Sequence, residues 1–305
     1  GVQTCALPIW KYVALRVFRY NLPRRITNTA VLSDVICFLP DFKALDRRFD
    51  RLALGSPGNQ IPGIRERLRE DRSTFNGRVG YGGTMDYIIR NETGKDQRHV
   101  EELTRDAFWN IHGPGCDEHY LVHVMRPHPD FIPELDFILE KDGRIIGNIL
   151  YTQSGLVNDK GETMRTLTFG PLSIAPDFQR KGYGKALMEH SFEQAGRMGY
   201  PAVVIFGNPG NYVSMGFRSC SRYSVSIGNG IFPSAMLVRE LRDAAIPKGV
   251  WRYLESEVYS IDPVKAEKFD KGFEYKEKKI LPSQEEFFIL SKSRVHVDSV
   301  DVSTT

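Results

Sequence analysis

The chain has 305 residues, of which 41% are hydrophobic and 26% are charged, and these values are ordinary for a globular protein. They exclude wholesale disorder and a collagen-like chain, and no stretch approaches the roughly 20 uninterrupted apolar residues of a membrane span. The net charge of +3 is too small to indicate nucleic-acid binding. Four cysteines without zinc-site or disulfide spacing favour a reducing compartment, so we expect a cytoplasmic protein without a bound metal.

Charge is distributed unevenly along the chain. Residues 1–84 carry 14 Lys and Arg against 7 Asp and Glu, whereas residues 85–305 carry 27 against 31. The first part has no sustained helix or strand period, and the first methionine, Met85, begins the first convincing strand. We therefore expect residues 1–84 to be a disordered or non-native extension. The alternatives are an Arg-rich targeting segment and a basic arm that binds nucleic acid.

Residues 85–305 alternate between strand and helix patterns. In chain order, we expect a strand at 86–90, a helix capped by Asp96, a helix over 118–125, a hairpin of strands 135–140 and 145–152, a strand at 166–174, a long helix that ends near Gly199, a strand at 202–206, a short helix from Asn211, and strands at 223–227, 235–238 and 253–259. This order predicts an α/β fold with a mixed sheet and helices on its faces. Residues 85–230 would form one domain, with 231–305 as an extension that packs on it and ends in a disordered tail.

The loop at 179–185 joins a strand to the long helix and carries the clearest chemical signal. Gly182 and Gly184 have no side chains, so backbone N–H groups can approach an anion closely. The start of the helix adds unpaired donors and a partial positive charge. Arg180 and Lys181 add two cations. Together these features predict a site for a pyrophosphate. The alternative is that the two glycines only allow the chain to turn into the helix, without binding a ligand.

Other phosphate-binding loops fit this segment less well. A P-loop needs Ser or Thr after its lysine, and here Lys185 is followed by Ala186. A dinucleotide-binding fingerprint needs a small residue three places after Gly184, where Leu187 stands.

Three segments resemble motifs of one enzyme family. Residues 179–184 resemble the Q/R-x-x-G-x-G/A motif of the GNAT acyl-coenzyme A N-acetyltransferase superfamily. Residues 172–176 resemble the strand that precedes this motif, and residues 208–217 resemble the family's N…Y-x-x-x-G-F segment. The resemblance covers roughly residues 85–227, in the family's order, and the chain from about Phe232 resembles the C-terminal extension of some uncharacterised members. It implies a central mixed sheet with splayed central strands, helices on both faces, and acetyl-CoA as co-substrate.

The resemblance also implies how the cofactor is held. Backbone groups of Leu172, Ser173 and Ile174 would pair with the pantetheine arm in the gap between the splayed strands. The pyrophosphate would be bound by Gln179, Arg180, Lys181, Gly182, Tyr183, Gly184 and Lys185. Asn208 would contact the cofactor as well. Gly170 and Pro171 are unusual in a buried strand, and we expect a bulge there that opens the splay, or else an irregularity without function.

Tyr212 lies where the family places its general acid. A phenol with a pKa of about 10 can donate a proton to a leaving thiolate whose conjugate acid has a pKa of about 8.5. The alternative is that Tyr212 only packs on its short helix. Direct attack of an amine on the acetyl thioester also needs a base, for which Glu118, His119, Glu134, Asp136 and a chain of waters are candidates.

The polar segment at 116–123 is expected to border the acceptor pocket, so we assign Glu118, His119 and Asp136 to substrate binding. His119 and His123, spaced four residues apart, suggest a metal with Cys116, although no further ligand supports it. A solvated helix face capped by Asp117 is the plain alternative.

The resemblance therefore predicts an N-acetyltransferase that moves an acetyl group from acetyl-CoA to a primary amine of a small molecule or peptide. A non-catalytic acyl-CoA-binding or regulatory module on the same fold is the alternative, and Tyr212 favours the enzyme. We expect an amine acceptor as partner, no nucleic acid and no membrane, and the resemblance leaves a homodimer open. The sequence does not identify the acceptor.

Overall fold

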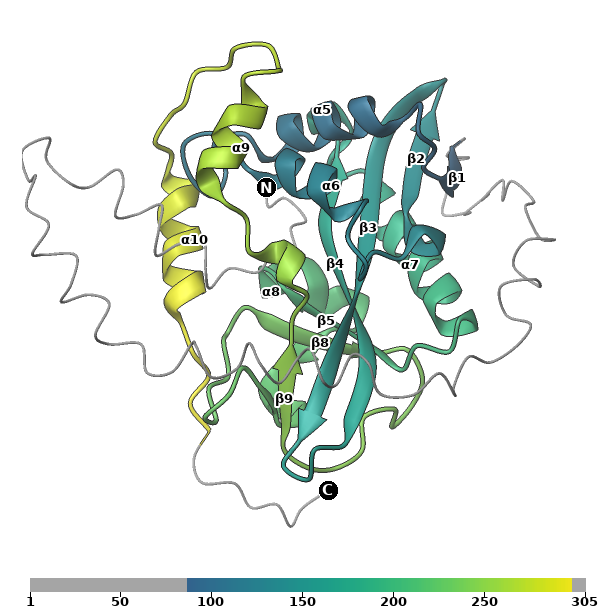
Figure 1. Ribbon diagram of the computed structural model, residues 1–305, viewed down its shortest axis with the longest axis vertical. Helices are drawn as coiled ribbons and strands as arrows, with labels where there is room; N and C mark the ends of the chain where they lie inside the picture. Colours follow the sequence, from purple (N-terminus) through teal and green to yellow (C-terminus); the bar gives the residue numbers. More distant parts are fainter. Residues whose placement is uncertain (1–86, 298–305) are drawn as a thin grey trace, which may run out of the picture. The chain divides into compact units, whose positions relative to one another are not determined.

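The computed structural model describes residues 87–297, which form a mixed sheet with helices on both faces (Figure 1). This architecture confirms the expected α/β class. The extension expected over 1–84 and the tail expected over 298–305 lie outside the described residues. Within 87–297, no helix combines the length and the apolar character needed to cross a membrane.

The elements follow the expected order as far as Phe206. They are β1 (Ile88–Asn91), α5 (Gln97–Phe108), α6 (Glu118–Met125), β2 (Phe137–Lys141), β3 (Arg144–Asn158), β4 (Thr163–Ile174), α7 (Tyr183–Arg197), β5 (Ala202–Phe206), α8 (Pro209–Tyr212), β6 (Arg218–Ser219), β7 (Val225–Ser226), β8 (Met236–Glu240), β9 (Trp251–Leu254), α9 (Pro263–Asp270) and α10 (Pro282–Lys292). The hairpin strands β3 and β4 are longer than expected. The strand expected at 253–259 is wrong in its second half, because Glu257–Tyr259 form a 3-10 helix.

The sheet has the strand order β1-β2-β3-β4-β5-β8-β6. Neighbours from β1 to β4 are antiparallel, whereas β4 and β5 run parallel. Residues 231–297 contribute two strands to this sheet, since β8 pairs with β5 and β9 pairs with the last residues of β3. The extension also contains α9 and α10, which the sequence analysis did not predict.

β4 and β5 separate soon after they meet. Their only register pair among the described residues is Leu167 with Val203, although β4 continues to Ile174. We call the point beyond this pair the fork, and it corresponds to the expected splay. Near the fork, Ile149 of β3 pairs with Leu172 and Tyr151 pairs with Phe169. Two residues of β4, 170 and 171, therefore oppose one residue of β3, which is the expected bulge.

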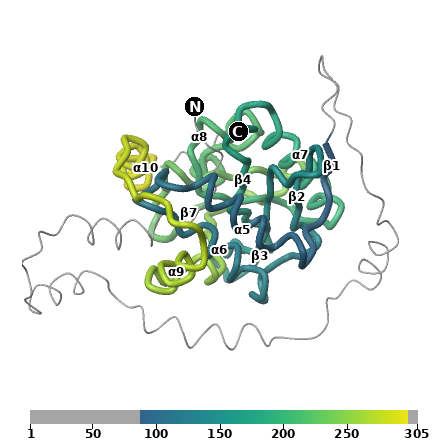
Figure 2. Tube along the Cα trace, turned by 90° about the horizontal axis from the view of Figure 1, so that it is seen from above, coloured from purple at the N-terminus to yellow at the C-terminus, as the bar shows by residue number. Residues whose placement is uncertain are grey.

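The two faces of the sheet are covered by different helices. Seen from above, α7 and α8 lie on one side of β4, and α5, α6 and α9 lie on the other (Figure 2). We call these sides the α7 face and the α5 face. Because the bulge adds one residue between them, Phe169 and Leu172 both pack on the α7 face, with Leu187 and Phe192 of α7. Leu150 and Ile138 pack on the α5 face with Val100 and Met125.

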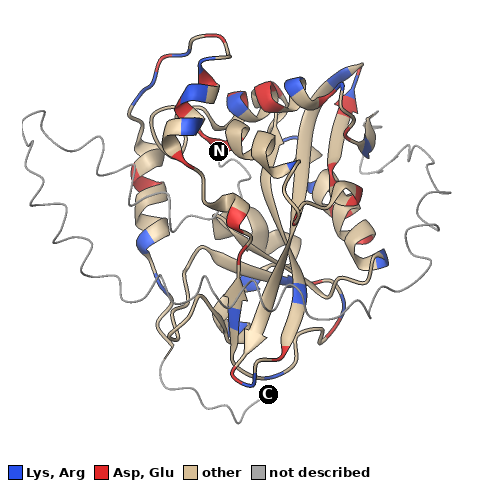
Figure 3. Cartoon of the chain, in the orientation of Figure 1, with Lys and Arg blue, Asp and Glu red and all other residues tan. Residues whose placement is uncertain are grey.

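Many charged side chains lie on the outside of this arrangement, although Arg105, Glu118 and Asp136 are buried. Figure 3 shows residues of both signs interspersed over α5, α7 and α9. By contrast, β3 and β4 each contain a single charged residue, Arg144 and Arg165. The two longest strands therefore present mainly apolar and hydroxyl side chains to the helices that cover them.

Helix starts follow the local sequence only in part. Asp262 caps α9 by accepting from the N–H groups of Val264 and Lys265. Asp96 and Asp117 stand before α5 and α6, but neither makes the expected side-chain cap bond. The carboxylate of Asp96 accepts instead from the N–H of Thr93 and from Arg90. The cap expected at Asp96 is wrong because Arg90 and Thr93 donate to its carboxylate instead. The cap that the alternative gave to Asp117 is absent as well.

Candidate active site

The start of α7 lies directly after the loop that follows β4. Gly182 has φ +89° and Arg180 has φ +64°, so the loop turns back sharply before the helix begins. Ala186 donates the first intrahelical hydrogen bond, to the carbonyl of Gly182 at 3.0 Å. The N–H groups of residues 183–185 precede it and have no acceptor within the helix. This end of α7 offers clustered donors and a positive dipole end, which suit a diphosphate.

The side chains of the loop have separate tasks. Gln179 Nε2 donates to the carbonyl of Ile174 at 3.0 Å, so it ties the loop to the end of β4. Lys181 Nζ donates to the carbonyl of Asp177 at 2.8 Å, and Arg180 is exposed. The ring of Tyr183 is buried against Phe178. Lys185 is exposed and pairs with Glu189 one turn later. Arg180 and Lys181 are therefore two exposed cations directly before the start of α7.

Leu172, Ser173 and Ile174 form the end of β4 beyond the fork. All three are buried, and their backbones pair with β3 on one side only, because β5 has separated from them on the other. That second edge can accept an extended ligand as an added strand. The Ser173 hydroxyl lies on the α5 face, where its Oγ donates to Thr104 Oγ1 at 3.1 Å.

Tyr212 lies on the α7 face close to the fork. It is fully buried, and its ring packs against Phe169 and Phe217 with centroid distances of 6.0 and 5.7 Å. Gly216 adopts φ +87°, and a Cβ there would lie 2.9 Å from Arg239 Nη1, so this turn requires glycine. Asn208 caps α8, since its side-chain oxygen accepts from the N–H of Gly210 at 2.9 Å.

Glu118 and His119 begin α6 and are buried rather than solvated, which corrects the plain alternative of an exposed helix face. Glu118 Oε1 lies 2.9 Å from His112 Nδ1. His119 is completely buried, with Nδ1 3.4 Å from Cys116 Sγ and Nε2 3.1 Å from Asp270 Oδ1. His119 therefore links α6 to α9 of the extension.

Asp270 is the centre of that link. Arg105 Nε donates to Asp270 Oδ1 at 2.7 Å, beside the contact with His119. Burial alone would raise the pKa of Asp270, but hydrogen bonds from His119 and Arg105 outweigh it and lower the pKa to about 2. His123 lies elsewhere, with Nδ1 3.0 Å from Glu101 Oε1. Among residues 87–297 no group of three His, Cys, Asp or Glu side chains is arranged to hold a metal, Cys116, His119 and His123 included.

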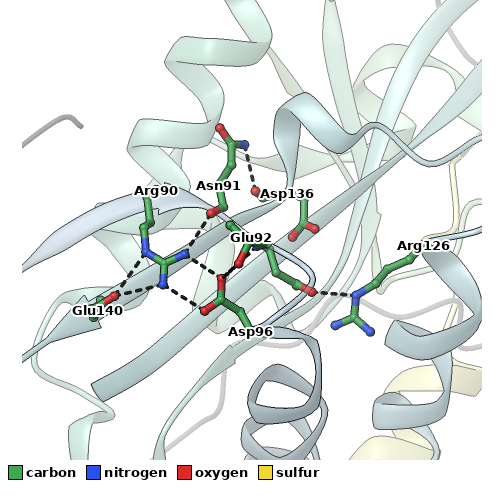
Figure 4. A network of polar contacts seen from close by, with 8 residues as sticks. Arg90, Asn91, Glu92, Asp96, Arg126, Asp136 and Glu140 are labelled. Atoms are coloured by element: carbon green, nitrogen blue, oxygen red, sulfur yellow. Dashed lines mark hydrogen bonds and ion pairs between the residues drawn. The ribbon is translucent and has the colours of Figure 1, made fainter. Parts of the chain in front are cut away.

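Asp136 lies just before β2 in a second group of polar residues (Figure 4). The Arg126 guanidinium pairs with Glu92, with Nε 2.8 Å from Oε1. Burial and the negative charge of Glu92 raise the pKa of Asp136 well above its usual range. Burial raises the pKa of Glu92 too, against the opposing charge of Arg126. The same guanidinium also pairs with Glu101 at 2.9 Å. Because several carboxyls compete for one positive charge, the protonated form of Asp136 is favoured.

The candidate bases do not share one set of contacts. Glu118 contacts His112, His119 contacts Asp270, Asp136 lies with Glu92, and Glu134 is exposed. No single residue among them is selected by this geometry.

Sequence reasoning missed a set of polar residues on the α5 face at the fork. Ser154 Oγ and Thr166 Oγ1 are 2.9 Å apart, and Thr168 Oγ1 lies 2.5 Å from the hydroxyl of Tyr253. Thr152 Oγ1 donates to the hydroxyl of Tyr259 at 3.2 Å. The signal was present as Ser and Thr at every second position of two neighbouring strands.

Comparison with known proteins gives the following similarities. Residues 101–218 match the family model described as "Acetyltransferase (GNAT) family". The "Uncharacterized N-acetyltransferase YhbS" of Escherichia coli (strain K12) is 26% identical over 160 residues, which cover 52% of this chain and 90% of that protein. The matched residues 101–218 contain the fork, the loop at the start of α7 and Tyr212.

Two solved structures are also similar. One is a GNAT family N-acetyltransferase (YhbS) from Escherichia coli in complex with CoA, at 23% identity and a TM-score of 0.49, covering 60% of this chain and 97% of that one. The other is a GNAT family acetyltransferase from Brucella melitensis in complex with acetyl-CoA, at 20% identity and a TM-score of 0.44, covering 57% and 97%.

Proposed function

We propose that this chain, whose residues 101–218 match the GNAT acetyltransferase family model, moves an acetyl group from acetyl-CoA to a primary amine of a small molecule or peptide. The observation that carries the proposal is the fork between β4 and β5, which opens toward the start of α7. An extended pantetheine arm fits the free edge of β4, and its diphosphate then meets the donors at the helix start.

The loop after β4 supplies the groups that suit acetyl-CoA. Gly182 and the first turn of α7 offer backbone donors, and Arg180 and Lys181 add the charge that neutralises a diphosphate. Gln179 acts indirectly, because its bond to the Ile174 carbonyl fixes the loop relative to the strand. Leu172, Ser173 and Ile174 provide the backbone edge for the pantetheine amides. Asn208 shapes α8, and its cap bond is the support for a positioning role.

In the proposed reaction, the amine nitrogen forms a bond to the thioester carbonyl carbon and the bond from that carbon to sulfur breaks. A backbone N–H on the free edge of β4 stabilises the negative charge that develops on the carbonyl oxygen. Tyr212 gives its phenolic proton to the departing thiolate, and the proton that the attacking nitrogen loses passes through solvent and restores the phenol. Its support is position, since the ring packs on Phe169, next to the bulge at the fork.

Thiol release by the full chain, measured with acetyl-CoA and a panel of primary amines, tests this function. Turnover with at least one amine is the expected result. Binding of acetyl-CoA measured by calorimetry, without turnover on any amine, would instead identify a non-catalytic acyl-CoA module. Absence of both binding and turnover would defeat the proposal.

A further inference from the structure

On the α5 face, a different helix stands beside each strand of the fork. α5 lies over β4, where Ser173 Oγ donates to Thr104 Oγ1 at 3.1 Å. On β5, Ile205 packs on the α7 face, so its neighbour Val204 faces the α5 face. Phe287 of α10 packs against the cluster that contains Val204. α5 and α10 therefore cover the β4 side and the β5 side of the fork.

Residues 109–117, which join α5 to α6, connect these two helices across the fork, and we call them the α5–α6 loop. The ring of His112 in this loop lies on that of Phe287, with a centroid distance of 4.3 Å. Ser283 Oγ of α10 donates to the carbonyl of Ile111 at 3.1 Å. The loop therefore passes from the helix over β4 to the helix beside β5.

The C-terminal extension adds a second segment, which lies on this loop. Residues 274–281 lead from α9 to α10 without forming a helix or strand, and we call them the strap (Figure 1). Every residue of the strap except Lys276 is exposed, so little apolar burial holds it in place. The Glu277 carbonyl accepts from Trp109 Nε1 at 2.9 Å and from Asn110 Nδ2 at 3.0 Å. A segment that is held mainly by hydrogen bonds opens at a small cost in free energy.

Asn110 joins the strap to the loop. It is buried and has φ +62°, which turns the chain sharply after α5. Its Oδ1 accepts from the N–H of Gly115 at 2.8 Å and from that of Lys279 at 3.0 Å, while its Nδ2 donates to Glu277. Gln284 Nε2 of α10 donates to the carbonyls of Asn110 and Lys279, at 3.0 and 2.8 Å. One amide side chain thus fixes both the turn of the loop and the position of the strap.

We propose that the α5–α6 loop and the strap form a gate over the α5 side of the fork, that Asn110 is the latch of this gate, and that the amine acceptor enters when it opens. The other side of the fork is filled by the rings of Tyr212 and Phe169. A closed gate keeps water from the thioester between turnovers. The purpose of the gate rests on the proposed acetyl transfer, whereas its opening is measured without turnover.

Alkylation of Cys116 by iodoacetamide measures the opening, because Cys116 belongs to the loop and is only 5% exposed. The full chain is treated, and mass spectrometry of the peptide gives the rate. Asn110→Gly removes the latch side chain and keeps the turn, since glycine adopts a positive φ without strain. With three hydrogen bonds lost, we expect Cys116 to react at least about tenfold faster. Cys220, buried in another cluster, should react at an unchanged rate.

Asn229→Gly is the matched control, because Asn229 also has a positive φ, of +52°, but is exposed. It should leave the alkylation rate of Cys116 unchanged. If Asn110→Gly does not fold, Gln284→Ala takes its place, since it removes the two bonds from α10 to the loop and the strap. We expect Cys116 to react about threefold to tenfold faster in this variant. A Cys116 rate equal to that of the control would overturn the latch.

Thiol release with acetyl-CoA tests whether the gate is the route of the acceptor. Among the amines that the unmodified chain accepts, the kcat/KM of the largest relative to the smallest should rise about fivefold or more in Asn110→Gly, because a loosened gate admits larger groups. An unchanged ratio despite faster alkylation of Cys116 would overturn this route. Absence of thiol release with every amine in the unmodified chain would defeat acetyl transfer instead, and alkylation would still decide the latch.

Discussion

The α7 face and the α5 face of the sheet are filled in different ways. On the α7 face, Phe169, Phe192, Tyr212 and Phe217 form one cluster of rings, and Tyr151, which also packs on Phe169, has its hydroxyl 2.7 Å from Ser191 Oγ. On the α5 face, the same stretch of β4 carries hydroxyls that contact the hydroxyls of β3 and of Tyr253. The comparison separates two kinds of site, one fixed by apolar packing and one built from hydrogen-bonding groups.

The two faces also draw on different parts of the chain. The ring cluster lies within residues 101–218, which match the family model. Tyr253 and Tyr259 lie beyond it. The ring cluster therefore comes from the segment that matches the family model, whereas part of the hydroxyl network comes from the extension.

On the α7 face, we expect the largest loss of activity from a substitution at Tyr212. Tyr212→Phe keeps the ring packed on Phe169 and Phe217 and removes only the proposed proton donor. We expect kcat to fall by about a hundredfold or more, with acetyl-CoA affinity unchanged. Thiol-release kinetics and calorimetry measure the two quantities. Tyr275→Phe, at an exposed tyrosine, is the control, and an unaltered kcat in Tyr212→Phe would leave Tyr212 a packing role only.

The cofactor end of the fork is the next test. Replacing both Arg180 and Lys181 by Glu sets two negative charges beside the proposed diphosphate, so acetyl-CoA affinity should fall by about thirtyfold or more. Calorimetry measures the loss, and unfolding by urea checks that stability is kept. Arg197→Glu is the control, because Arg197 is exposed in the last turn of the same helix. Equal affinity in both variants would remove the diphosphate from this loop.

The contacts of Asp270 on the α5 face should also contribute to the stability of the fold. Asp270→Asn weakens the contacts that tie α9 to Arg105 and His119, and Arg105 is almost fully buried. A buried guanidinium without its carboxylate is costly, so the free energy of unfolding should fall by about 2 kcal/mol. Urea unfolding of the full chain measures it. Asp243→Asn, in an exposed loop, should have little effect, and an equal effect of the two would mean that the link adds nothing.

The same contrast explains what the sequence could and could not reveal. Periodicity and glycine placement are local, so they predicted α7, its glycine start and the bulge at residues 170–171. The contact of His119 with Asp270 joins residues 151 positions apart, and nothing in either local pattern requires it. The start of α9 did have a local signal in Asp262-Pro263, but its short apolar pattern gave no clear helical face.

The smallest expected effect is at Asp136, in the polar group beside β1 and β2. Its pKa is raised in the folded state, by burial and then by Glu92, so the folded protein holds a proton that the unfolded chain releases above about pH 4. The contribution of Asp136 to stability is therefore complete below that pH and is lost as the pH rises through the folded pKa.

Asp136→Asn imitates the protonated side chain and should escape this loss. The free energy of unfolding of this variant minus that of the unmodified chain should be near zero at pH 4. This difference should rise by roughly 1 kcal/mol toward pH 8. Urea unfolding at several pH values measures the trend, with Asp142→Asn at an exposed turn as the control. A difference that does not change with pH would show that Asp136 is ionised in the fold, held by Arg126 despite Glu92.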